Sequence, residues 1–301
     1  MTSLKAPPIL LLLALLSSCA FNKLFYQPEK MPPTPVTLQL TDKERGDTTY
    51  INFTDNKYQP VFSNKKHEPL DPQYKLESVV FSSRSGNKLN GWWLTPKTKP
   101  NGIAMLFLHG NGGHLLSQFA GATPFAKRGY KVLIVDYSGY GYSEGHSTRG
   151  NFLADGNSAL DYMLSRPEVK GDKIVIYGQS LGGHLSATVA AQNETRIDGL
   201  VMEGAPSSHK DIAARMAGPF GFSARLLVRE GYAAKRSIAL FHKPVLVIHS
   251  TEDKTIPFDL GQRLYAHANQ PKSFYEIKHG HIAGPRYYAD SISARIIAML
   301  R

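Results

Sequence analysis

Cysteine is almost absent from this chain, whose 301 residues include a single one, Cys19. A disulfide within one molecule is therefore excluded, and so is a thiol nucleophile anywhere after residue 19. Long hydrophobic runs are also lacking. The apolar stretch at residues 9–16 has eight residues, whereas a membrane-spanning helix needs about twenty. Neither a fold cross-linked by disulfides nor an integral membrane protein fits this composition.

Dense basic clusters are missing as well, although the formal net charge is +11. Lysine and arginine are scattered along the chain without a nucleic-acid-binding motif, so nucleic acid is not an expected partner. Solvated basic faces are the simplest interpretation, and attraction to an anionic lipid surface is the alternative. A hydrophobic fraction of 42% is sufficient for one large domain.

The N-terminus has the parts of an export signal. Lys5 forms a short basic region, residues 9–16 form the apolar part, and the tetrapeptide Leu-Ser-Ser-Cys ends at Cys19. This tetrapeptide resembles a bacterial lipobox. The resemblance implies that residues 1–18 are removed as a signal peptide. It also implies that Cys19 receives acyl chains such as palmitate, which anchor the protein to a membrane of the cell envelope.

Ala20 follows Cys19, with no acidic residue of the inner-membrane retention type. This favours the outer membrane, facing the periplasm. An ordinary cleaved signal with an incidental cysteine is the alternative.

Residues 19–75 are expected to form an N-terminal extension. Its prolines favour an extended tether at residues 27–36. Residues 48–53 and 57–62 are typical of two short strands. Whether the extension packs on the main domain or only spaces it from the membrane is left open.

From residue 76 to residue 301, strand and helix patterns alternate. Residues 79–83 and 89–94 bracket a turn and predict a hairpin. Buried strands are expected at 103–108, 132–135, 174–177, 200–202 and 245–248, and a last strand at 274–277. Helices are expected at 115–127, 151–164, 181–192, 259–268 and 285–300. This alternation predicts an α/β fold, a mostly parallel central sheet with helices on both faces. Short helices at about 206–241 fit either a cap over a pocket or ordinary packing against the sheet.

The pentapeptide from Gly178 to Gly182 reads Gly-Gln-Ser-Leu-Gly and stands between a predicted strand and a predicted helix. This is the context of a nucleophile elbow, in which glycines flank a serine on a tight turn. By chance alone the pattern arises in roughly one of ten chains of this length. The role of Ser180 as a nucleophile therefore depends on partners elsewhere in the chain.

Candidate partners follow other predicted strands, at the sheet edge where working residues of such folds gather. Residues 109–113, His-Gly-Asn-Gly-Gly, follow one strand, and the backbone N–H groups of Asn111 and Leu181 are the expected oxyanion donors. Asp253 follows another strand and is the candidate acid, with Glu252 as the alternative. His281 follows the last strand and is the candidate base, with His279 as the alternative.

A zinc pair at His279 and His281 is a further interpretation, but no third ligand stands out in the sequence. Glu203, at the end of the 200–202 strand, is a weaker candidate for the acid.

The order Ser180, Asp253, His281 is that of the α/β-hydrolase fold. Residues 135–145 also resemble the D-Y-R-G-Y-G-x-S-x-G segment of its serine esterase and lipase-like branch, with Ser138 in place of the arginine. The resemblance implies a serine hydrolase of acyl esters that uses Ser180, Asp253 and His281, with no metal or organic cofactor.

Three other functions remain open. They are an acyl-thioesterase, a peptidase or amidase with the same triad, and a non-catalytic envelope lipoprotein. The expected partners are a small-molecule or lipid ester as substrate and a membrane through lipidated Cys19. No obligate protein partner is inferred.

Overall fold

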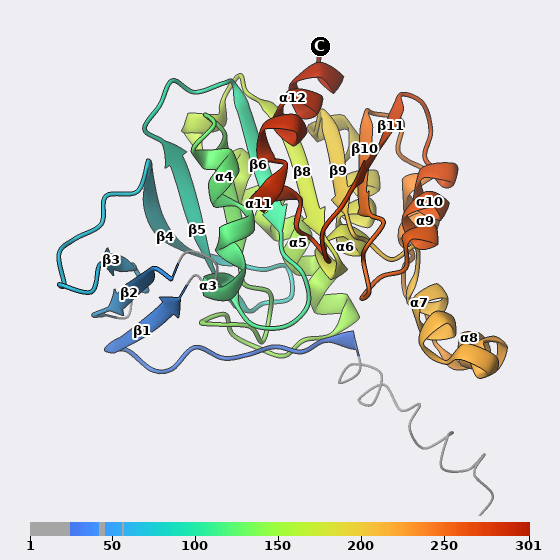
Figure 1. Cartoon of the computed structure of the whole chain (residues 1–301), viewed down its shortest axis with the longest axis horizontal. Coiled ribbons are helices and arrows are strands. Elements are labelled where there is room, and N and C mark those ends of the chain that lie inside the picture. The colour runs from blue at the N-terminus through green and yellow to red at the C-terminus, as the bar shows by residue number, and fades with distance from the viewer. Residues whose placement is uncertain (1–24, 42–45, 56) are drawn as a thin grey trace, which may run out of the picture.

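A computed structural model describes residues 25–41, 46–55 and 57–301, which are built around an eight-stranded sheet. Across the sheet the strands follow the order β11, β10, β9, β8, β6, β7, β5 and β4 (Figure 1). Their bounds are Tyr74–Ser82 for β4, Lys88–Pro96 for β5, Ile103–Leu108 for β6, Lys131–Val135 for β7, Lys173–Gln179 for β8, Gly199–Glu203 for β9, Val245–Ser250 for β10 and Lys272–Ile277 for β11. The strands from β11 to β7 are parallel, whereas β5 and β4 pair antiparallel. The predicted mostly parallel sheet and its hairpin are therefore confirmed.

Alternate side chains of the central strands enter two separate cores. In β6, Leu106 belongs to one core and Phe107 to the other, and both are fully buried. Helices cover both faces of the sheet, which explains why these strands are continuously apolar. One core is closed by α5 (Arg149–Ser165), α6 (Leu181–Gln192) and α10 (Phe258–His267), and the other by α4 (Thr123–Ala126) and α12 (Ala289–Met299) (Figure 1).

Two helices predicted as continuous are interrupted. The pieces are α3 (Leu115–Gln118), a 3-10 turn (Phe119–Gly121) and α4 in place of 115–127, and α11 (Gly284–Tyr287) and α12 in place of 285–300. Gly121 explains the first break. A Cβ atom on this residue would lie 2.8 Å from the Phe107 ring and 2.9 Å from the Gln179 side chain. The chain approaches the sheet there more closely than a regular helix with side chains allows.

The N-terminal extension packs on the main domain. Three strands, β1 (Val36–Thr41), β2 (Thr48–Phe53) and β3 (Val61–Ser63), form a small antiparallel sheet beside β4 and β5 (Figure 1). Ile51 and Phe53 of β2 are buried in the same core as Trp92. The strand predicted at 48–53 is confirmed as β2. The strand predicted at 57–62 is wrong for residues 57–60, because β3 begins at Val61 and Gln59 instead hydrogen-bonds through its side chain to Leu76 and Ser78 of β4.

The segment at 206–241 divides into two parts. Helix α9 (Ala234–Ile238) packs against α6, with Ala234 and Ile238 fully buried. Helices α7 (His209–Met216) and α8 (Gly221–Leu227) instead form a hairpin that projects from the body (Figure 1). The predicted signal and Cys19 lie outside the described residues. Within the described part of the chain, no helix has both the length and the apolar character to span a bilayer.

Candidate active site

Ser180 lies on a sharp turn between β8 and α6, with φ 52° and ψ −117°. Its glycine neighbours are required by close approach. A Cβ atom on Gly178 would lie 2.4 Å from the carbonyl oxygen of Gly182, and one on Gly182 would lie 2.1 Å from that of Leu108. The strained conformation persists because backbone from β6 and α6 closes around it. Such a turn exposes the serine at the carboxyl edge of the sheet.

Asp253 and His281 are brought together from the loops after β10 and β11. The imidazole Nδ1 lies 2.7 Å from Asp253 Oδ2. The other carboxylate oxygen accepts the N–H groups of Thr255, at 2.8 Å, and Ile256, at 2.9 Å. Burial alone would raise the pKa of Asp253, but the hydrogen bond and charge of His281, with these N–H groups, hold it below its usual value. The carboxylate is thus kept ionised beside the ring.

The alternative residues do not join this pair. Glu252 accepts the backbone N–H of His279 at 2.9 Å and therefore stabilises the loop. The ring of His279 stacks on Tyr287, with centroids 4.2 Å apart. His279 and His281 consequently have separate partners. Among the described residues, no group of three or more histidine, cysteine or acidic side chains is arranged to hold a metal ion.

Ser180 and His281 both adjoin the loop after β9, and no hydrogen bond joins their side chains. A Cβ atom on Gly204 would lie 3.2 Å from the His281 ring, and one on Gly110 would lie 3.4 Å from Ser180 Cβ. The N–H of Ser180 donates to the carbonyl of Glu203, which directly precedes Gly204, at 2.8 Å. Bonds between a nucleophile and its base are often loose before substrate binds. The Ser180 hydroxyl has no hydrogen-bond partner among the described residues.

The glycine-rich loop after β6 forms the opposite wall. Among the described residues, neither the N–H of Asn111 nor that of Leu181 has a hydrogen-bond acceptor in the structure. Asn111 is held through its side-chain oxygen, which accepts the N–H of Gln27 at 2.8 Å and the hydroxyl of Tyr140 at 3.0 Å. The Tyr137 hydroxyl donates to His109 at 2.9 Å. These buried tyrosines pack behind the loop and hold it in place.

Two features of the site are not evident from the sequence. The first is the N-terminal segment at residues 25–31, which runs between the two active-site loops. Glu29 exchanges backbone hydrogen bonds with Gly113 and Gly141, at 3.0 and 2.8 Å. Tyr26 is 3% exposed and packs on Phe152 of α5, with ring centroids 4.5 Å apart. The segment expected to be a tether packs against the glycine-rich loop that carries Asn111.

The second feature is Glu203, buried at the end of β9. Its carboxylate accepts the Tyr177 hydroxyl and the Gln179 amide, each at 2.7 Å, and the N–H of Gly284 at 2.6 Å. Burial raises its pKa, and these hydrogen bonds oppose the rise. Glu203 therefore ties the residue before Ser180 to the loop that carries His281. Its position at a strand end is the one signal for this role in the sequence.

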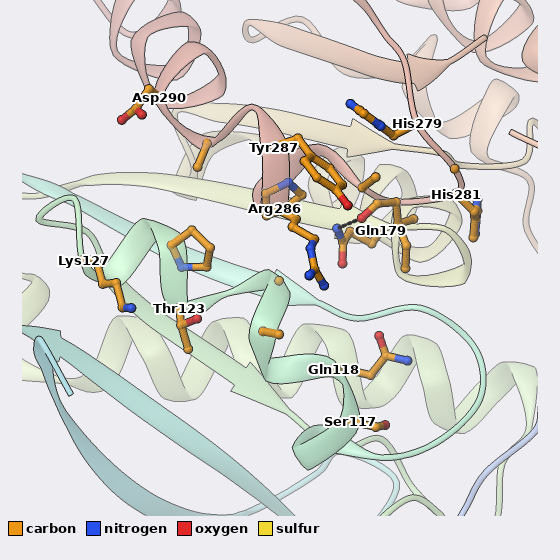
Figure 2. Close-up of a pocket in the computed structure, with 18 of the residues that line it drawn as sticks. Ser117, Gln118, Thr123, Lys127, Gln179, His279, His281, Arg286, Tyr287 and Asp290 are labelled. Carbon is orange, nitrogen blue, oxygen red and sulfur yellow. Dashed lines mark hydrogen bonds between the residues drawn. The ribbon is translucent and has the colours of Figure 1, made fainter. Parts of the chain in front are cut away.

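A groove of about 930 Å³ opens beside His281 and Gln179. Figure 2 shows Thr123 and Lys127 on one side and Arg286 and Tyr287 near its centre. The Gln179 amide, which also donates to Ile282, forms part of its floor. This groove gives a substrate group direct access to the imidazole.

Known proteins show what this architecture resembles. The family described as the alpha/beta hydrolase fold matches residues 103–226. The uncharacterized protein YfhR of Salmonella typhi is 31% identical over 223 residues, which cover 69% of this chain and 74% of YfhR.

Two solved structures of low sequence identity share the fold. Esterase Pf2001 of Pyrococcus furiosus superposes with a TM-score of 0.63 at 17% identity, covering 92% of this chain and 97% of that chain. Est1E of Butyrivibrio proteoclasticus, solved with ferulic acid bound, gives 0.61 at 18% identity, covering 73% and 98%. The sequence match to YfhR, the family match and the sheet with its serine turn lead to one conclusion: this chain belongs to the α/β-hydrolase superfamily.

Proposed function

We propose that the protein is a serine hydrolase that cleaves carboxylic acyl esters through an acyl-enzyme. The observation that carries the proposal is the Asp253–His281 hydrogen bond of 2.7 Å beside a serine on a strained elbow. The esterases Pf2001 and Est1E share the fold, and Est1E was solved with ferulic acid bound. They support an ester over a thioester or amide as the bond attacked.

Ser180 supplies the nucleophile in this mechanism. Its Oγ attacks the ester carbonyl while its proton passes to Nε2 of His281, and Nδ1–H of the ring donates to Asp253. The negative charge on the former carbonyl oxygen is stabilised by the N–H groups of Asn111 and Leu181. Collapse of this intermediate breaks the ester C–O bond, and His281 returns the proton to the leaving alcohol.

Deacylation repeats these steps with water. His281 takes a proton from water, the hydroxide attacks the acyl carbonyl, and the acid leaves as the proton returns to Ser180. The same two N–H groups stabilise the second oxyanion.

Substitution of the serine tests the proposal. Ser180→Ala should lower kcat for p-nitrophenyl butyrate by at least about 10⁴-fold and abolish labelling by a fluorophosphonate. Ser186→Ala is the matched control, because Ser186 is a fully buried serine of α6 that donates to Gly183. Labelling or turnover that persists in Ser180→Ala would refute the assignment. Assays with matched thioesters and amides would identify a different preferred bond.

We further propose that Cys19 carries acyl chains that hold the protein on a membrane of the cell envelope, facing the periplasm. Support comes from the Leu-Ser-Ser-Cys sequence and from Cys19 being the chain's single cysteine. Growth with an alkyne-tagged fatty acid should label the parent protein and leave Cys19→Ser unlabelled and unprocessed. Equal labelling of both proteins would contradict the proposal.

A further inference from the structure

The hairpin of α7 and α8 exposes large apolar side chains at its end. Met216, Phe220, Phe222 and Leu226 are 68%, 75%, 77% and 68% exposed, and we name this group the α8 tip. Phe222 and Leu226 are four residues apart on α8 and therefore share one face of that helix. In Figure 1, α8 lies beyond α7, at the lower right of the molecule. An apolar group this exposed is typical of a surface that meets a partner.

The tip is held in place by buried contacts behind it. The Asp211 side chain of α7 is 0% exposed and pairs with Arg225 of α8. Two more cations reach the same carboxylate, Lys235 at 2.7 Å and Arg263 at 3.2 Å. A Cβ atom on Gly221 would lie 2.5 Å from a carbonyl oxygen of α7, so the two helices approach closely. These contacts hold α8 against α7, with the apolar side chains of the α8 tip facing solvent.

The tip stands at the carboxyl edge of the sheet, where Ser180 also lies. Helix α7 begins a few residues after β9 ends. Between them lies Gly204, where an added Cβ atom would be 3.2 Å from the His281 ring. A surface that docks through the tip is therefore held near the proposed active site.

The N-terminal segment reaches the base of the same hairpin. Phe25 meets the ring of His209, the first residue of α7, edge to face at 5.0 Å. Cys19 precedes Phe25 by six residues, which span at most about 22 Å even when fully extended. An acylated Cys19 would therefore hold the base of the hairpin close to the bilayer.

Charge around the tip suits anionic lipid. Four cations lie at residues 209–229, namely Lys210, Arg215, Arg225 and Arg229. Arg215 is paired with Asp259 and Arg225 with Asp211, whereas neither Lys210 nor Arg229 forms an ion pair within the described part of the chain. Asp211 is the one carboxylate in that interval, and its side chain is buried. Apolar side chains bordered by arginine are typical of helices that lie in a membrane interface.

A second copy of the chain fits less well. At these exposures the four side chains present on the order of 500 Å² of apolar surface. A stable protein interface buries about 800 Å² on each partner.

We propose that the α8 tip inserts into the interfacial region of an anionic bilayer beside the acylated N-terminus, so that the active site takes amphiphilic acyl esters from that bilayer. The choice of substrate rests on the proposed function, whereas the docking of the tip does not.

Tryptophan fluorescence tests the docking directly. The native tryptophans, Trp92 and Trp93, are buried, at 2% and 1% exposed. Quenching by brominated lipid therefore reports on the introduced indole. The full chain carrying Phe222→Trp is reconstituted into phosphatidylethanolamine–phosphatidylglycerol vesicles with brominated acyl chains. Bromine should quench its emission several-fold more than that of Val80→Trp. Val80 is 50% exposed on β4, at the far edge of the sheet.

A matched pair of leucines tests the contribution of the tip to binding. Leu226 is 68% exposed on α8, and Leu240 is 67% exposed before β10, at the opposite end of the sheet. In a chain that begins at Ala20, without the signal and Cys19, Leu226→Ser should weaken cosedimentation with these vesicles by roughly tenfold, and Leu240→Ser by less than twofold.

Three results would overturn the docking proposal. They are equal quenching at residues 222 and 80, equal cosedimentation of the two leucine variants, and a dimer that Leu226→Ser converts to monomer in light scattering. Ser180→Ala should dock like the parent. Docking without ester hydrolysis would therefore refute the proposed function and leave the docking inference standing.

Discussion

At the scale of single residues, the site contains two buried carboxylates in opposite environments. Asp253 is paired with an imidazole, and its pKa is held below the usual value. Glu203 is surrounded by neutral donors, and burial raises its pKa. The first carboxylate can stabilise a positive charge that forms on His281. The second connects Gln179 with the 282–284 loop, so its contribution is positional.

Glu203→Gln should lower kcat by about 10- to 100-fold at nearly constant KM. An amide replaces one accepting oxygen with an NH₂ group that faces the donors of Tyr177, Gln179 or Gly284. Small displacements of catalytic groups have effects of this size on kcat. The free energy of unfolding should fall by about 1–3 kcal/mol. Steady-state kinetics and urea unfolding measure the two effects.

The control is Glu276→Gln, which alters an exposed glutamate on β11, at the edge of the same sheet. Kinetics that match in the two variants would show that Glu203 does not position the catalytic groups.

Residues that follow a recognisable strand can be predicted from the sequence as candidates for the site. Ser180, Asp253 and His281 each follow a predicted strand, and parallel strands bring such positions to one edge. Glu203 also stands at a strand end, but its partners are a buried tyrosine and a backbone N–H far away in the chain. No local pattern marks such contacts, so its positional role could not be predicted.

At the scale of elements, the central strands could be predicted from the sequence, whereas the packing of the N-terminal segment could not. The strand at 103–108 is predicted to the residue, because burial on both faces requires six apolar side chains in a row. The segment at 25–31 pairs through backbone groups of Glu29, Gly113 and Gly141. Backbone hydrogen bonds carry no side-chain signature, and the prolines nearby indicate only extended chain. Its packing against the glycine-rich loop therefore could not be predicted.

Tyr26→Ala should destabilise the fold by about 3–5 kcal/mol, the usual cost of removing a buried aromatic ring. The ring is 3% exposed and packs on Phe152, so its loss leaves a cavity under the N-terminal segment. Urea unfolding measures the change. Tyr26→Phe keeps the ring and should cost less than about 1.5 kcal/mol. A loss below about 1 kcal/mol in the alanine variant would show that the segment is not part of the cooperative fold.

At the scale of the whole molecule, buried ionisable groups make stability depend on pH in opposing directions. Burial lowers the pKa of His109 to about 4 and that of His184 to about 3. These histidines favour unfolding as the pH falls, because only the unfolded chain takes up their protons. Burial raises the pKa of Asp136 to about 7, which has the reverse effect. The total pH dependence is therefore a partial cancellation, and single groups are best isolated by substitution.

His184→Phe should remove one of these opposing contributions. Both ring nitrogens of His184 lack a hydrogen-bond partner among the described residues, and the ring centroids of His184 and Tyr232 are 5.2 Å apart. An apolar ring at this position therefore breaks no hydrogen bond of the side chain. The folded pKa, about 3, lies below the unfolded value of about 6.5. Through this group, the free energy of unfolding of the parent therefore falls by about 2 kcal/mol between pH 7 and pH 5, and that of the variant does not. Urea unfolding of both proteins at the two pH values measures this difference.

His242→Phe is the control, because that side chain is 66% exposed in the folded chain. If the parent and His184→Phe lost the same stability on acidification, the buried histidine would not be neutral in the folded state.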